Sequence, residues 1–238
     1  MLPSSNCNPV SAKAQCLIIA LERVSKRSSG RLKSPFPRSR QVSLVGSLQY
    51  AILGWDEIYE MCIHLARKVR KSRYSPDIIV GIARGGWIPA RILSDLMENP
   101  NVANMKIEFY VDVGKTSSQP RITQDVSTSV AGKRLLVVDD VADSGKSLSL
   151  VRESLMKRGA AEVRIATLHY KPKSVTKPEY YVAETEAWIV YPHERFEFMR
   201  SRTEKMRSEK PREEIKQDFL KMGIPKTAVD EFFDYFSS

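Results

Sequence analysis

The hydrophobic side chains between residues 55 and 97 recur at intervals that predict two helices around one strand. In the first helix apolar side chains are three or four residues apart, and the basic stretch 67–73 suits its C-terminus. Pro76 interrupts this helix, and the apolar segment 77–83 that follows predicts a buried strand. The second helix is predicted at 89–97, with a proline in its first turn.

The same alternation continues further along the chain. Residues 105–111 alternate between apolar and polar, which predicts a strand with one buried face. The mostly apolar segments 133–138 and 163–168 predict two more strands, separated by a helix at 145–158 that Gly159 ends. Strands joined through helices predict an α/β fold with a doubly wound, mainly parallel sheet, whose functional loops gather at one edge.

Three other segments lack this pattern and set the expected domain limits. Residues 1–46 are basic and serine-rich, which predicts a disordered extension or a mis-assigned start, and an organellar transit peptide also fits. Residues 47–199 form the main domain, in which the polar stretch 112–128 predicts a mobile loop. Residues 200–238 are a helical C-terminal extension. Its two predicted amphipathic helices are at 213–222 and 226–236.

Charge and cysteine content exclude several classes of protein. The net charge is +10, but residues 1–45 hold eight basic residues and one acidic residue, so a nucleic-acid surface is not predicted for the folded domain. The longest apolar run, 16–21, is far shorter than the roughly 20 residues that span a membrane. Cys7, Cys16 and Cys62 form no C-x-x-C pair, so we expect no disulfide framework, no cysteine zinc site and a cytoplasmic location.

The candidate chemistry centres on residues 137–147, where the third predicted strand ends. Asp139 and Asp140 are adjacent carboxylates, which a buried strand end tolerates only beside cations or hydroxyl donors. The next residues open a helix, and their free N–H and hydroxyl groups can bind a phosphate. This phosphate loop consists of Ser144, Gly145, Lys146 and Ser147. Carboxylates for ribose hydroxyls or Mg²⁺, followed by a phosphate loop, predict a ribose 5-phosphate site.

Two other phosphate-binding motifs do not fit the spacing. A P-loop requires a glycine five residues before Gly145, and that position is Asp140. The glycines at 81, 85 and 86 do not match the dinucleotide motif G-x-G-x-x-G. Neither an ATPase nor a dinucleotide-dependent dehydrogenase is predicted.

Residues 137–147 resemble the motif with which type I phosphoribosyltransferases bind phosphoribosyl pyrophosphate (PRPP). The resemblance extends over about 50–198. Ala83-Arg84-Gly85-Gly86 is similar to the loop that holds pyrophosphate in this family. Tyr170-Lys171-Pro172 and Ala187-Trp188-Ile189 are similar to base-binding elements of its xanthine-guanine group.

The resemblance implies a type I phosphoribosyltransferase fold with a small base-binding hood beside the predicted C-terminal helices. It implies a Mg²⁺-dependent pentosyltransferase of purine salvage. Such an enzyme transfers the 5-phosphoribosyl group of PRPP to a 6-oxopurine (guanine, xanthine or hypoxanthine) and releases pyrophosphate. A homo-oligomer, either a dimer or a tetramer, is implied as well.

The resemblance also implies which residues bind PRPP. Asp139 and Asp140 would hold the ribose 2′ and 3′ hydroxyls, directly or through Mg²⁺. Arg84, Gly85 and Gly86 would bind the pyrophosphate. A transition state with positive charge on the ribose is stabilised by carboxylates near the sugar, which agrees with these roles.

Four further residues would act on the purine. Asp143 would be the general base for the imidazole proton, and a carboxylate here is similar to the 6-oxopurine enzymes rather than the adenine or orotate ones. Lys171 would donate a hydrogen bond to the 6-oxo oxygen. Trp188 would stack on the base, with Ile189 beside it.

A non-catalytic, PRPP-sensing regulator of the same fold is the alternative. Such a regulator usually carries a DNA-binding module, but residues 1–45 contain no convincing helix-turn-helix, and Asp143 and Lys171 are both present. Two residues depart from the family pattern: Ser144 replaces a threonine, and His193 stands where bacterial xanthine-guanine enzymes have an aromatic residue. The preferred 6-oxopurine therefore stays open.

The remaining aromatic and histidine residues have simpler interpretations. Trp55 and Trp87 are assigned to packing. The three histidines share no metal-ligand spacing and are assigned structural roles; they are His64, His169 and His193.

Overall fold

A computed structural model describes residues 42–45, 48–110 and 119–236, and a six-stranded sheet forms its centre. The strands of this sheet are β3 (Ile78–Ala83), β4 (Val102–Tyr110), β5 (Gln119–Gln124), β6 (Arg134–Ala142), β7 (Glu162–Tyr170) and β8 (Tyr180–Glu184). They lie in the order β5-β4-β3-β6-β7-β8, and all neighbours in this sheet are parallel except β4 and β5. The predicted doubly wound, mainly parallel sheet is confirmed.

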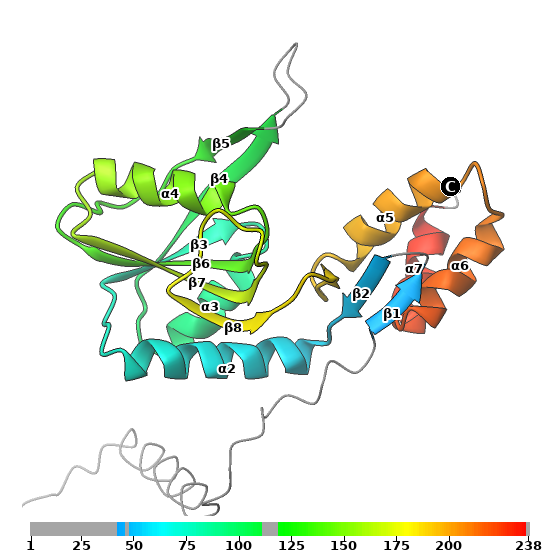
Figure 1. Cartoon of the computed structure of the whole chain (residues 1–238), viewed down its shortest axis with the longest axis horizontal. Coiled ribbons are helices and arrows are strands. Elements are labelled where there is room, and N and C mark those ends of the chain that lie inside the picture. The colour runs from blue at the N-terminus through cyan, green and yellow to red at the C-terminus, as the bar shows by residue number, and fades with distance from the viewer. Residues whose placement is uncertain (1–41, 46–47, 111–118, 237–238) are drawn as a thin grey trace, which may run out of the picture. The chain divides into compact units, whose positions relative to one another are not determined.

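Helices cover both faces of this sheet. Figure 1 shows α2 (Trp55–Lys71) and α3 (Trp87–Leu96) on one face and α4 (Lys146–Lys157) on the other. At the start of α2 the backbone N–H of Gly54 donates a hydrogen bond of 2.7 Å to the carboxylate of Glu57. The last turn of α2 is basic, which suits the negative end of the helix dipole. Its buried face consists of Ile58, Met61, Cys62, Leu65, Ala66 and Val69.

Burial on both faces explains why the central strands are continuous apolar segments in the sequence. In β3 the residues from 78 to 82 are all buried, and in β6 those from 135 to 138 are. Side chains alternate between the two faces of a strand, and Val80 and Val137 share one apolar cluster with Val151 of α4. A parallel sheet enclosed in this way fixes the positions of the loops at its edges.

A second, smaller sheet packs with the C-terminal helices. Its strands β1 (Val42–Val45), β2 (Leu48–Ile52) and β9 (Trp188–Val190) lie in the order β1-β2-β9. The helices are α5 (Arg195–Met206), α6 (Arg212–Lys221) and α7 (Lys226–Tyr235). Tyr50 and Val190 of the sheet share an apolar core with Phe198, Phe219 and Phe232 of the helices. None of the described helices is both long enough and apolar enough to pass through a membrane.

Some boundaries differ from those predicted. The loop predicted at 112–128 is wrong for residues 119–124, which form β5 as an edge strand with mostly exposed side chains. Such a strand carries few apolar residues and so leaves little periodicity in the sequence. β1 lies inside the predicted extension, whereas residues 1–41 and 111–118 lie outside the described part of the chain. The two predicted C-terminal helices are confirmed as α6 and α7.

Candidate active site

The loop after β3 meets the end of β6 and the loop after it at the carboxyl edge of the large sheet. The strand β6 extends to Ala142, so Asp139 and Asp140 belong to it and not to the loop in which the sequence placed them. The strands β3 and β6 are adjacent and parallel, so residues 84–86 and 139–147 lie close together. A Cβ atom on Gly85 would lie 2.0 Å from Oδ2 of Asp140, so the backbone of the first loop lies directly against that carboxylate. The two segments that the sequence singled out therefore form one site.

A pocket of about 660 Å³ opens beside the first loop. Its lining includes Arg84, Gly85, Trp87, Lys106, Asp140 and Glu197. The peptide bond between Ala83 and Arg84 is cis. Arg84 forms an ion pair with Glu197 of α5, and Nζ of Lys106 lies 2.6 Å from the carboxylate of Glu108. An anion that binds here would therefore compete with two carboxylates for these cations.

Carboxylates are concentrated next to this pocket. Burial and the neighbouring charge of Asp140 raise the pKa of Asp139 well above its ordinary value. Burial, followed by the charge of Asp140, also raises the pKa of Glu194 to about 7. His193 contacts Asp140, with Nε2 of the ring 3.3 Å from Oδ2 of the carboxylate. Buried carboxylates with raised pKa values are stabilised when a cation or hydroxyl donors bind to them.

These carboxylates fit the Mg²⁺ ion that the resemblance implies. Mg²⁺ prefers carboxylate oxygens and keeps several ligands from water and substrate phosphate. Among the described residues, no group of three or more His, Cys, Asp or Glu side chains is placed to hold a metal ion alone. An ion beside Asp139 and Asp140 would therefore complete its coordination with oxygens of substrate and water.

Two buried side chains form hydrogen bonds that end on the backbone oxygen of Asp140. The hydroxyl of Tyr191 donates to the backbone oxygen of Asp140 at 2.9 Å and lies 2.7 Å from Nδ1 of His169. Burial lowers the pKa of His169 to about 4, so its ring is neutral at pH 7. The ring of His193 stacks on Tyr191, with ring centroids 5.3 Å apart. His169 thus has the structural role predicted for it, whereas His193 contacts a predicted site residue.

The phosphate loop occupies the N-terminus of α4. Gly145 precedes the helix with a φ of +76°, a left-handed conformation that glycine adopts without strain. It has no side chain with which to cap the helix, and the N–H of Lys146 lies 3.4 Å from the hydroxyl oxygen of Ser144. The N–H of Lys146 thus has a partner inside the loop, and the binding of a phosphate at this helix N-terminus stays a prediction.

A smaller pocket of about 140 Å³ shares Asp140 and Glu194 with the larger one. The other residues that line it are Val141, Asp143, Lys171, Trp188, Ile189 and Tyr191. The side chain of Trp188 is 54% exposed, and Nζ of Lys171 lies 5.7 Å from the centre of its ring. The structure therefore brings together the four residues predicted to act on the base.

Asp143 is paired with two lysines in this pocket. Its Oδ1 lies 3.2 Å from Nζ of Lys171 and 3.0 Å from Nζ of Lys173, which the sequence did not single out. Burial alone would raise the pKa of Asp143, but Lys173 and Lys171 outweigh burial and lower that pKa. Oδ1 is shielded from solvent although the side chain is 46% exposed, so Oδ2 is the accessible oxygen. Asp143 is thus ionised at neutral pH, as a proton acceptor must be.

The assignment of two tryptophans to packing is wrong. Trp55 and Trp87 are 53% and 52% exposed, because each begins a helix at the edge of the site. Trp87 lines the larger pocket, and the ring of Trp55 lies 6.2 Å from that of His193. Trp87 therefore forms part of the wall of the larger pocket, and Trp55 contacts a residue that lines it.

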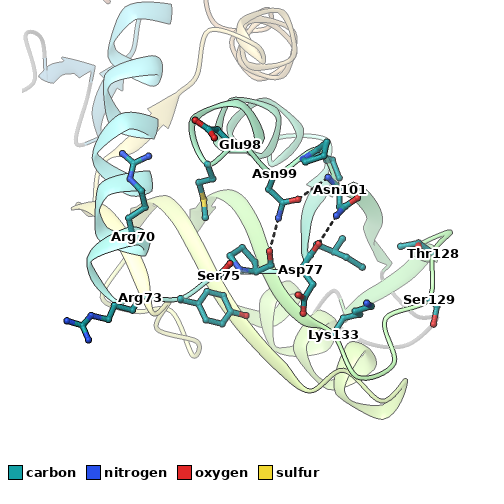
Figure 2. Close-up of a pocket in the computed structure, with 16 residues that line it drawn as sticks. Arg70, Arg73, Ser75, Asp77, Glu98, Asn99, Asn101, Thr128, Ser129 and Lys133 are labelled. Carbon is teal, nitrogen blue, oxygen red and sulfur yellow. Dashed lines mark hydrogen bonds between the residues drawn. The ribbon is translucent and has the colours of Figure 1, made fainter. Parts of the chain in front are cut away.

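A more spacious pocket, of about 950 Å³, lies elsewhere. Figure 2 shows it at the start of β3 and β4, on the edge of the sheet opposite the site. The side-chain amides of Asn99 and Asn101 donate to the backbone oxygens of Pro76 and Asp77, and Arg73 points away from them. These polar groups bind one another, so the pocket has a structural explanation and volume alone does not locate the site.

The raised pKa of Glu194 predicts a pH-dependent loss of stability. In the unfolded chain the carboxyl group of Glu194 loses its proton near pH 4.5, whereas in the folded protein its pKa is about 7. Folding is therefore penalised increasingly between these values and fully above 7. Glu194→Gln removes the penalty, so Tm should rise by several degrees at pH 8 and hardly change at pH 4, as calorimetry at both pH values would measure. Glu186→Gln, an exposed control, should leave Tm unchanged, and an equal gain at both pH values would contradict this assignment.

Comparisons with known proteins agree with the geometry. The family described as "Phosphoribosyl transferase domain" matches residues 51–196. A xanthine-guanine phosphoribosyltransferase of Gluconobacter oxydans is 29% identical over 148 residues, which cover 61% of this chain and 85% of the relative. A hypoxanthine-guanine phosphoribosyltransferase of Streptococcus pneumoniae is 31% identical over 147 residues, which cover 60% of this chain and 78% of the relative.

A solved structure extends the similarity to three dimensions. The purine phosphoribosyltransferase from Pyrococcus horikoshii is 39% identical, with a TM-score of 0.55, and the match covers 60% of this chain and 93% of that chain. The family match ends at residue 196, before most of α5 and all of α6 and α7. The similarity therefore covers both predicted loops and the pocket between them.

Proposed function

The chain belongs to the phosphoribosyl transferase domain family, and from this we propose that it transfers the 5-phosphoribosyl group of PRPP to a 6-oxopurine base. The products are the nucleoside monophosphate and pyrophosphate, as in purine salvage. One observation carries the proposal: two pockets share Asp140 and Glu194, and one of them is lined by Arg84 and Gly85 whereas the other is lined by Asp143, Lys171 and Trp188.

PRPP would lie across the carboxyl edge of the large sheet. Its 5-phosphate would accept hydrogen bonds from residues 144–147, and its pyrophosphate would face Arg84. During the transfer the bond from C1′ to a pyrophosphate oxygen breaks, and the electron pair leaves with pyrophosphate. The positive charge that develops on the ribose is stabilised by Asp139 and Asp140. Mg²⁺, when bound, would neutralise charge on the pyrophosphate.

The purine would lie in the smaller pocket. Its face would stack on the exposed ring of Trp188, and its 6-oxo oxygen would accept a hydrogen bond from Nζ of Lys171. The ring nitrogen forms the new bond to C1′, and the imidazole proton passes to Oδ2 of Asp143. Adenine has an amino group instead of the 6-oxo acceptor, so Lys171 disfavours it.

A pyrophosphate-release assay with PRPP and Mg²⁺ tests this function. Guanine, hypoxanthine, xanthine, adenine and orotate would each be offered as the acceptor, and we expect turnover with one or more 6-oxopurines only. Turnover with adenine or orotate would contradict the proposed base class. Binding of PRPP without turnover of any base would favour the regulatory alternative instead.

Glu197 is expected to restrain PRPP binding. It pairs with Arg84 although both side chains are largely exposed, at 51% and 72%, and exposed pairs of this kind are weak. Glu197→Gln frees Arg84 for pyrophosphate, so the KM for PRPP should fall by about two- to fivefold with kcat unchanged. Steady-state kinetics would measure this, with Glu204→Gln on the same helix as the control. A higher KM in Glu197→Gln would mean that Glu197 orients Arg84 rather than competing for it.

A further inference from the structure

Residues 171–176, which follow β7, run alongside the phosphate loop. At one end the backbone N–H of Lys171 donates to the oxygen of Ala142 at 3.0 Å. At the other end the N–H of Val175 donates to the oxygen of Ser144, also at 3.0 Å. The hydroxyl of buried Thr176 donates to the oxygen of Gly145 at 2.9 Å. Three of four successive backbone oxygens from 142 to 145 are therefore held by one neighbouring segment.

Side chains complete this arrangement. Asp143, the residue between these oxygens, is paired through Oδ1 with Lys171 and Lys173 of the same segment. The segment is itself closed by a turn in which the N–H of Ser174 donates to the oxygen of Lys171 at 2.9 Å. The hydroxyl of Ser174 also donates to the oxygen of Thr176 at 2.9 Å. Residues 171–176 and 142–145 thus form one hydrogen-bonded unit.

The packing leaves no room between the two segments. A Cβ atom on Gly145 would lie 2.3 Å from the hydroxyl oxygen of Ser174 and 2.6 Å from the backbone nitrogen of Thr176. The left-handed φ of Gly145 turns the chain into α4 at this point. A displacement of Thr176 therefore shifts the first turn of the helix that presents N–H groups to the phosphate.

We infer that Thr176 is a positioning residue that holds the phosphate loop in its binding conformation through the backbone oxygen of Gly145. The inference rests on the proposed function, because it assigns the phosphate of PRPP to residues 144–147. Thr176 lines neither pocket. Because the same segment carries Lys171, loss of the Thr176 hydroxyl should weaken binding of PRPP and of the base together.

The test compares Thr176→Val with Thr176→Ser in the full chain. Valine keeps the shape of threonine but removes one of the two donors to the oxygen of Gly145, which keeps the backbone N–H of Ser149 at 3.0 Å, whereas serine keeps the hydroxyl. We expect Thr176→Val to raise the Kd for PRPP, measured by calorimetry with Mg²⁺, by about tenfold, and Thr176→Ser to stay within about twofold. The KM values for PRPP and base should rise together, with a smaller change in kcat.

Thr203→Val is the matched control. The hydroxyl of Thr203, on α5, is buried without a hydrogen-bond partner among the described residues, so the same substitution there removes no hydrogen bond. If Thr176→Val fails to fold, Ser174→Ala replaces it. This substitution removes the hydrogen bond from the hydroxyl of Ser174 to the backbone oxygen of Thr176, and so loosens the same segment. The same rise in Kd is expected.

The outcomes separate this inference from the function on which it rests. Wild-type affinity in Thr176→Val, or an equal loss in Thr176→Val and Thr176→Ser, would overturn the role of the hydroxyl while the function stands. Failure of the wild-type chain to bind PRPP would overturn the proposed function and the inference with it. A loss in Thr176→Val that Thr176→Ser restores, with Thr203→Val unchanged, supports the inference.

Discussion

Asp143→Asn is expected to lower kcat by about 10²- to 10⁴-fold, because it removes the group that accepts the purine proton. Asparagine has the same shape and can still accept hydrogen bonds through its amide oxygen, so the contacts with Lys171 and Lys173 can remain. The phosphate loop and the pair Asp139 and Asp140 are unchanged. The Kd for PRPP should therefore stay within about threefold of the wild-type value.

Single-turnover kinetics with a saturating 6-oxopurine would measure the chemical step, and calorimetry would measure PRPP binding. Asp125→Asn is the control, since Asp125 pairs with Arg158 away from both pockets. It should leave kcat within about twofold. A chemical step near the wild-type rate in Asp143→Asn would refute the general-base role. The lowered pKa of Asp143 further predicts that this group keeps its charge down to acidic pH.

The sequence was informative where the physical cause is local. The strands enclosed by helices appear as continuous apolar segments, so β3 was found with nearly correct limits, whereas β6 continues to Ala142, beyond its predicted end at 138. The loops after these strands were placed together because parallel strands end at the same edge of a sheet. Asp139, Asp140, Asp143 and residues 144–147 could be assigned to one site for this reason.

The parts that were missed depend on tertiary structure. β5 is an edge strand with polar side chains, and β9 has only 3 residues, so neither gives a clear periodic signal. Glu194 and Glu197 reach the site because α5 follows β9 towards the pocket, and no local pattern distinguishes them from other surface acids. The sequence offered one weak signal for them: two carboxylates three residues apart that follow the predicted base-binding segment.

The role of Lys173 could not be predicted for a similar reason. Its pairing with Asp143 requires the turn that residues 171–176 make beside the phosphate loop. The exposed positions of Trp55 and Trp87 likewise follow from where their helices begin, not from residue type. Residue type alone favoured a packing role for both tryptophans, but the start of each helix at the sheet edge leaves their side chains exposed.

Gly85→Ala is expected to lower kcat/KM for PRPP by about 10²-fold, through a collision rather than through a lost contact. The added Cβ would lie 2.0 Å from Oδ2 of Asp140 and 2.6 Å from its Cγ. Since atoms cannot approach so closely, either the loop of residues 84–86 or the carboxylate must move. Asp140 has little freedom, because it is buried and His193 lies 3.3 Å from the same oxygen.

Gly54→Ala is the control for this substitution, because its Cβ would meet its nearest neighbour, Oε2 of Glu57, at an ordinary 3.5 Å. Calorimetric titration of PRPP and circular dichroism on both variants would separate a local displacement from unfolding. We expect both to keep the wild-type spectrum and only Gly85→Ala to lose PRPP affinity. Wild-type affinity in Gly85→Ala would mean that the loop can withdraw from Asp140 without affecting the ligand, so the close approach of the two segments would not be required for binding.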